Sequence, residues 1–312
     1  MGTSLSTLAL DIASKESVIA VRARLAPLAK FAKSFADAEG EVGNTVKVPV
    51  FTRGVAQDFH ASNNNYTTAT SAGVGGVSVE LNKHPWESRR LLPDDVMETN
   101  VGKDWVGQVT KACVDSVAAY MVAEPLVGIL KDAASAGSSG HVTALTLSGA
   151  TALAKIAKIR KDTIAAGINP MEATLLLPSA LYTDLLAELP FNALGAERAI
   201  VDGAVERLFG FGYIAELQNA VTYTNTNSKL VTLDAMVVAN DALAVATRLP
   251  IVQNADLYDV SDIKSDEIGG FSIRVRSTGS NSVDAKFLGA EVIFGWKMLQ
   301  PEKILVASTT AS

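Results

Sequence analysis

The stretch VAQDFHASNNNYTTATSAGVGG, residues 55–76, is polar and rich in small side chains, although 48% of the chain is hydrophobic. It lies between NTVKVPVF (44–51) and GVSVELNKHPW (76–86), and both of these runs alternate in a way that predicts strands. The alternating apolar positions are Val46, Val48, Val50, Val77, Val79 and Leu81. Paired strands are usually joined by two to five residues, and much longer connections are either functional or disordered. The purpose of this loop is therefore the first question that the sequence raises.

Residues 11–37, before the first strand, are predicted to form a helix because apolar residues recur at intervals of three and four. Pro27 is expected to kink or restart this helix, since it lacks a backbone donor. Two interpretations remain open, an ordinary surface helix and an arm that contacts another subunit. In the second, the contacting residues are Val18, Val21, Leu25, Leu28 and Phe35. Deleting residues 1–38 would then leave the subunit folded.

The strongest helical pattern covers residues 94–124. Pro93 and the pair Asp94–Asp95 suit a helix start, and Pro125 is expected to end the helix. An apolar or sulfur-containing residue recurs at every fourth position: Met97, Val101, Trp105, Val109, Cys113, Val117 and Met121. At about 1.5 Å per residue the helix would be roughly 45 Å long. We expect a spine helix whose core face includes Val101, Trp105, Val109, Cys113 and Val117.

The rest of the chain mixes both kinds of element. A helix is predicted at 149–166, a buried strand at 173–178, and a second helix from Pro178. Residues 208–252 alternate short strands and helices, and the C-terminal part is rich in strands. This order predicts an α+β fold without the regular alternation of a nucleotide-binding sheet.

The sequence contains no local motif that is typical of a catalytic, nucleotide-binding or metal-binding site. His60, His84 and His141 lie far apart, and Cys113 lies in the apolar stripe, so neither a metal site nor a nucleophile is indicated. We therefore predict no catalytic, cofactor-binding or metal-binding residues. The net charge of −6 argues against a dedicated nucleic-acid binder. The sequence contains no run of 18 apolar residues, so no membrane span is predicted. A single cysteine excludes an internal disulfide and favours a reducing compartment.

The order of these segments resembles the major capsid proteins of tailed bacteriophages, which share the Johnson fold. The resemblance covers nearly the whole chain and rests on the order and spacing of its pieces. These pieces are EVGNTVKVPVF, VSVELNKHPWESRRLLPDDV, EATLLLPSALYTDLLAEL, LFGFGYIAEL, AMVVANDALAVATRLP and KFLGAEVIFGWKMLQPEKILVA.

The resemblance implies a domain organisation. It consists of an N-terminal arm (1–45), an extension-loop hairpin (46–92), a peripheral domain with the long helix (93–180), an axial domain (181–251), and returning peripheral strands (252–312). The polar loop would be the extension loop, which lies over a neighbouring subunit that supplies its hydrogen-bond partners. The loop residues expected at that contact are Phe59, Asn63, Asn64, Asn65 and Tyr66.

The resemblance also implies a function. The chain would self-assemble as hexamers and pentamers into an icosahedral head shell around double-stranded DNA, without enzymatic activity, cofactor or membrane. Its implied partners are its own copies, a separate scaffolding protein, a portal, a decoration protein, and packaged DNA bound without sequence specificity. The implied location is the virion, after assembly in the host cytoplasm.

One departure from the family and two alternatives accompany this hypothesis. Some members link an extension-loop lysine to a neighbouring asparagine, but residues 54–76 contain no lysine; Lys47 and Lys83 lie at the hairpin base. We therefore expect a shell without covalent links. The alternatives are a soluble α+β enzyme with a mobile lid at 54–76, and a bacterial nanocompartment shell protein of the same fold.

Overall fold

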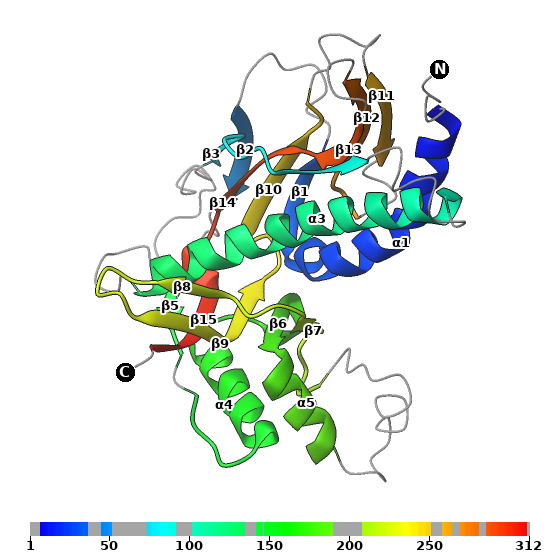
Figure 1. Cartoon of the computed structure of the whole chain (residues 1–312). Helices are drawn as coiled ribbons and strands as arrows, with labels where there is room; N and C mark the ends of the chain where they lie inside the picture. The colour runs from blue at the N-terminus through cyan, green and yellow to red at the C-terminus, as the bar shows by residue number, and fades with distance from the viewer. Residues whose placement is uncertain are drawn as a thin grey trace.

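The computed structural model describes residues 7–36, 45–51, 74–91, 102–134, 142–145, 147–189, 208–250, 258–263, 269–280 and 285–310. Helices and strands are mixed along the chain, as expected for an α+β protein. Helix α3 (Gly102–Ala134) crosses the middle of the molecule (Figure 1). The six-stranded sheet lies on one side of it together with α4 (Ala152–Ala165) and α5 (Ser179–Glu188), and the remaining sheets lie on the other side (Figure 1).

Helix α3 is the expected spine helix, but its C-terminal end was predicted wrongly. It continues through Pro125 to Ala134. A proline inside a helix removes one backbone hydrogen bond and crowds the preceding turn. Three side chains beyond it, Leu126, Ile129 and Leu130, are fully buried, and this packing holds the last turns in place. The predicted start at residue 94 lies outside the described residues.

Helix α1 (Thr7–Phe31) packs along α3 and is part of the subunit core. Val21, Leu25 and Leu28 are completely buried within the chain itself. The guanidinium of Arg24 also binds the carboxylate of Asp115 on α3 through two hydrogen bonds of 3.0 and 2.7 Å. The helix is continuous through Pro27, which corrects the expected restart.

The segment after α1 is a strand, whereas the sequence predicted helix up to residue 37. Strand β1 (Ala32–Ala36) pairs in parallel with β10 (Leu243–Arg248), in the register Ala32↔Leu243. Strand β14 (Ile293–Met298) completes this three-stranded sheet on the other side of β10. The N-terminal 30 described residues therefore supply both a core helix and a sheet strand.

A four-stranded antiparallel sheet lies beside α1 and α3. Its order is β11-β12-β13-β4. The strands are β4 (Trp86–Leu91), β11 (Tyr258–Ile263), β12 (Ile273–Ser280) and β13 (Ala285–Glu291). Within it, Arg274 of β12 binds Asp262 of β11 through two hydrogen bonds of 2.7 Å. Strand β4 is thus joined to strands almost two hundred residues further along the chain.

The six-stranded sheet has the order β5-β15-β9-β6-β7, with β8 paired to β9. Its strands are β5 (Thr143–Ala144), β6 (Ala173–Pro178), β7 (Tyr213–Leu217), β8 (Thr222–Thr224), β9 (Leu230–Ala239) and β15 (Ile304–Thr310). Two short 3-10 turns, Pro170–Glu172 and Pro301–Lys303, lead into β6 and β15. The domain boundary expected at 180/181 runs through this unit, because β6 and α5, which lie on either side of it, pack together. Strand β15 also belongs to this sheet, although the sequence placed residues 252–312 in the peripheral domain.

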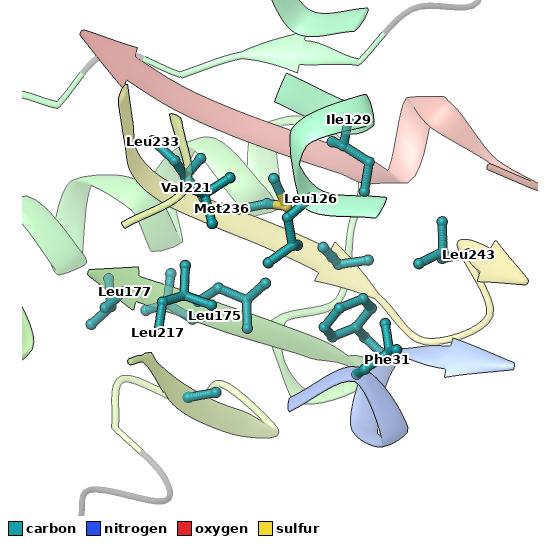
Figure 2. Packing of buried hydrophobic residues seen from close by; sticks show 14 of the residues in the cluster. Phe31, Leu126, Ile129, Leu175, Leu177, Leu217, Val221, Leu233, Met236 and Leu243 are labelled. Carbon is teal, nitrogen blue, oxygen red and sulfur yellow. The ribbon is translucent and has the colours of Figure 1, made fainter. Parts of the chain in front are cut away.

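One hydrophobic core extends through both sides of the molecule. Figure 2 shows Phe31 of α1 close to Leu243, with Leu126 and Ile129 of α3 above Leu175. Leucine and methionine side chains of β6, β7 and β9 continue the same cluster into the six-stranded sheet. A second, small cluster joins the hairpin of β2 (Thr45–Phe51) and β3 (Val74–Glu80) to β10. It contains Val48, Val79, Leu81, Ala244 and Ala246.

Helix α4 is capped by a carboxylate from α5. Glu188 accepts hydrogen bonds of 2.8 Å from the backbone N–H groups of Ala152 and Leu153, which have no partner within their own helix. These bonds, first the one from Leu153 and then the one from Ala152, lower the pKa of Glu188. A negative charge at a helix N-terminus is stabilising, so this contact ties the two helices together.

The Glu188 cap predicts a defined pH dependence. A carboxyl group whose folded-state pKa is lowered stabilises the fold above its unfolded pKa of about 4.3 and loses that contribution as the pH falls through the folded value. Glu188→Gln should therefore lower the midpoint of thermal unfolding at pH 7, and the difference from the wild type should close in acid. Asp184→Asn, on the exposed side of α5, is the control. A difference that stays constant from pH 7 to pH 3 would contradict this role.

Candidate functional site

The β2–β3 hairpin carries the ends of the polar loop. Strands β2 (Thr45–Phe51) and β3 (Val74–Glu80) pair antiparallel in the predicted way, from Thr45↔Glu80 at the base to Phe51↔Val74 at the tip. The two strands form a sheet of their own among the described residues. The loop residues predicted to make contacts, namely Phe59, Asn63, Asn64, Asn65 and Tyr66, lie outside the described residues.

The hairpin is attached to the body through the linker 81–85. Lys83 exchanges two backbone hydrogen bonds with Phe294 of β14, of 3.0 and 2.9 Å. Its ammonium group lies 2.8 Å from Glu124 of α3, and this hydrogen bond raises the pKa of Lys83. In β14, a Cβ at position 295 would overlap the carbonyl of Glu80, so Gly295 allows the strand to pass this close to the hairpin base. Lys83 therefore holds the linker to β14 and α3.

A buried carboxylate lies next to the same linker. Glu291 of β13 is only 3% exposed. One of its oxygens lies 3.1 Å from Nε2 of His84, and the other lies 3.3 Å from a guanidinium nitrogen of Arg276. A buried charge is tolerated when it is paired in this way. Glu291 thus fixes the linker to the four-stranded sheet with its charge satisfied.

A groove of about 400 Å³ separates the linker and β4 from α3. It is lined by His84, Pro85, Trp86, Glu87, Ser116, Val117 and Tyr120. Trp86 is 64% exposed and Tyr120 is 42% exposed, while the ring of Tyr120 packs edge-on against Phe294 with centroids 6.0 Å apart. Large exposed aromatic side chains are typical of sites where another molecule binds.

These two aromatic residues were not predicted from the sequence to belong to a site. Tyr120 lies outside the four-residue stripe of α3, and Trp86 falls in WESRRL, a segment noted only as part of the hairpin. The signal that could have indicated both residues is the same: each is aromatic, yet it lies at a position where the hydrophobic periodicity predicts exposure to solvent. The groove itself could not be found, because its walls come from segments thirty residues apart.

The predicted arm contact is corrected by the structure. Val21, Leu25 and Leu28 are buried against the chain's own core, so in this conformation they are not available to another subunit. Val18 packs partly buried against the same core, and Phe35 packs on the small cluster beneath the hairpin. The periodicity indicated a buried face correctly, but the partner of that face is α3.

The predicted spine positions lie as follows. Cys113 and Val117 are in the core at 1% and 2% exposure, and Val109 is half-buried against it. Val101 and the side chain of Trp105 lie outside what the structure describes. Burial raises the pKa of the Cys113 thiol to about 11, so the thiolate that a nucleophile needs is disfavoured.

The described residues contain no metal-binding cluster, and one of their helices has the length and composition of a membrane span. Within those ranges, no three or more His, Cys, Asp or Glu side chains gather as metal ligands would. Residues 107–133 of α3 are long and apolar enough by composition to cross a membrane. Half of this apolar stretch is buried inside the protein, as is usual for the core helix of a globular fold.

Comparison with solved structures identifies the fold. The chain superimposes on "Capsid of Ralstonia phage GP4" with a TM-score of 0.54 and 10% identity, covering 90% of this chain and 86% of that one. For "Capsid of empty GTA particle" the TM-score is 0.54, the identity is 13%, and the coverage is 93% and 90%. For "Mycobacterium phage Che8" the values are 0.51, 15%, 85% and 84%.

The chain therefore has the fold of phage major capsid proteins, which confirms the fold expected from the sequence. No protein-family model matches the sequence, and no curated protein matches it. The likeness is thus one of three-dimensional arrangement over nearly the whole chain.

Proposed function

We propose that this chain is the major capsid protein of a tailed phage, and that it self-assembles as hexamers and pentamers into an icosahedral shell around double-stranded DNA. The observation that carries the proposal is the extent of the structural likeness, which covers about nine tenths of this chain and of two capsid chains.

The mechanism of such a protein is association, with no covalent bond made or broken. The two-stranded β2–β3 sheet supports this mechanism, because it holds both ends of the polar loop and packs on β10 through the small cluster. We propose that Phe59, Asn63, Asn64, Asn65 and Tyr66 contact a neighbouring subunit. Aromatic residues carry much of the binding energy at such contacts, and the short polar side chains lose little entropy there.

The arrangement of the sheets supports a proposal for the domain organisation. We propose that the six-stranded sheet with α4 and α5, from 142 to 239 together with Ile304–Thr310, is the domain that meets its neighbours around the symmetry axes. In this proposal the domain bounds differ from the boundaries at 180 and 251 that were predicted from the sequence. The further partners in the proposal are a scaffolding protein, a portal, a decoration protein and packaged DNA, within the virion.

The test of the proposal is electron microscopy of the purified protein combined with limited proteolysis. We expect regular closed particles, in which residues 54–76 are protected from proteases that cut them in the free subunit. Equal cleavage in both states would remove the loop from the intersubunit contacts. A monomer that never assembles, alone or with partner proteins, would overturn the proposed function. Closed particles filled with protein cargo instead of DNA would identify a nanocompartment shell.

A further inference from the structure

Helix α4 carries a local excess of positive charge. Its 14 residues include four cations and a single acid, Asp162, although the chain as a whole has a net charge of −6. The cations are Lys155, Lys158, Arg160 and Lys161. Surface helices usually intersperse both signs of charge, so an excess of one sign along a whole helix indicates a partner of the opposite sign.

Two of these cations have acidic neighbours and two have none. Lys158 forms an ion pair with Asp162 one turn later, and Lys155 lies near the capping carboxylate of Glu188. Arg160 and Lys161 are exposed, and neither forms an ion pair with any residue that the structure describes. These two side chains are therefore available to a negatively charged partner.

The helix that presents them is fixed in place. Ile156, Ile159 and Thr163 are buried on its inner side, and Thr151 and Glu188 cap its N-terminus. In Figure 1, α4 lies at the lower edge of the molecule, with strands of the six-stranded sheet between it and α3. The cationic face is therefore preformed and open to solvent.

The other exposed positions of α4 indicate what kind of partner this face suits. Ala154, Ala157 and Ala165 are short, and the one large exposed apolar side chain of the helix is the half-exposed Ile164 near its end. The centres of protein–protein contacts are enriched in aromatic residues and depleted in lysine. Contacts with a nucleic-acid backbone depend on lysine and arginine instead. The composition of this face therefore favours a phosphate backbone over a protein surface.

The spacing of the cations fits such a backbone. They lie between residues 155 and 161, which is about 9 Å along the helix axis. One strand of double-stranded DNA presents a phosphate about every 3.4 Å, so this length of helix meets about three phosphates. A contact with so few phosphates is weak and is easily broken by salt. Weak binding suits DNA that has to enter and leave a shell.

From these observations we infer that the face of α4 carrying Arg160 and Lys161 binds the phosphate backbone of double-stranded DNA without reading its sequence. The inference rests on the proposed function, which supplies packaged DNA as the polyanion, and adds the surface of the subunit that meets it. Arg160 and Lys161 make the contacts, and Lys155 and Lys158 add to the local positive potential.

Fluorescence anisotropy of a labelled DNA duplex, titrated with the full chain, tests the inference. At about 20 mM salt we expect saturable binding at protein concentrations below about 0.5 mM. The logarithm of the affinity should fall against the logarithm of the salt concentration with a slope between about −2 and −4. A second duplex of unrelated sequence should bind within about twofold of the first, because phosphate contacts carry no sequence information.

Two double variants locate the contact. Arg160→Ala with Lys161→Ala should weaken binding at about 20 mM salt by about tenfold or more and make the salt slope shallower by about two. Lys229→Ala with Lys303→Ala removes the same charge from exposed positions elsewhere in the six-stranded unit, and should leave the slope unchanged. Because all four side chains are exposed, neither variant should shift thermal unfolding by more than a few degrees.

The outcomes separate this inference from the proposed function. An absence of binding at low salt, an equal loss in both double variants, or a strong preference for one duplex would overturn the inference. Each of these results leaves the capsid proposal standing, provided that electron microscopy still shows closed particles. If Arg160→Ala with Lys161→Ala prevents particle formation and the wild type binds no DNA, the face is a contact between subunits and the inference is wrong. A wild type that never forms particles would contradict the proposed function, whatever the anisotropy shows.

Discussion

Removal of residues 1–38 is expected to abolish folding. The deleted part includes four side chains that are at most 1% exposed: Val21, Leu25, Leu28 and Phe31. Burial of each contributes about 1.5–3 kcal/mol, so their loss costs roughly 6–12 kcal/mol. A domain is typically stable by only about 5–15 kcal/mol. The deletion also removes β1 and leaves an edge of β10 unpaired.

The measurement is solubility on expression, followed by circular dichroism and thermal unfolding of whatever is recovered. We expect insoluble protein, or soluble protein without a cooperative transition. A chain that lacks only residues 1–6, which precede α1, should unfold like the full chain. A truncated 39–312 protein with a normal transition would show that α1 is a separable arm, as one interpretation of the sequence proposed.

Val117→Asp is expected to have the second largest effect. The side chain of Val117 is 2% exposed and lies in the main core on α3. A carboxylate there is either buried without a partner or forced to bind a proton, and either outcome costs several kcal/mol. We expect a loss of at least about 3 kcal/mol, and insoluble protein at 37 °C.

Ala112→Asp is the matched control for this substitution. It introduces the same residue into the same helix at an exposed position, where the cost is the helix propensity of aspartate, about 0.7 kcal/mol. Urea unfolding of the two variants and the wild type gives the comparison. Similar losses in both variants would show that the cost comes from the helix backbone and not from burial. Val109 is a weaker probe because it is only half-buried.

The elements that could be predicted are those whose signal lies within one continuous segment. The spine helix repeats an apolar residue every four positions, and the two hairpin strands alternate, so both were found from the sequence. The α+β class followed from their order. The confirmed likeness to capsid proteins likewise depended on order and spacing, which survive at sequence identities near 10%.

The features that were missed depend on partners far along the chain. Residues 32–36 continue a helical pattern, but they become a strand because β10 offers them a free edge. Pro125 is tolerated because the following turns are buried. Hydrophobic periodicity predicts that the apolar face of α1 is buried. It does not predict whether the residues that pack against this face belong to the same chain or to another. The aromatic groove belongs to the same class, since it exists only where β4 passes α3.

The parallel pairing of β1 with β10 also has a consequence for folding during translation. Ala32 must wait for Leu243, about 210 residues later. At a typical elongation rate of 5–20 residues per second, the delay is roughly 10–40 s. During that time β1 has no strand partner, whereas α3, against which α1 packs, has already been synthesised. A nascent chain therefore completes this sheet only after most of its length has been translated.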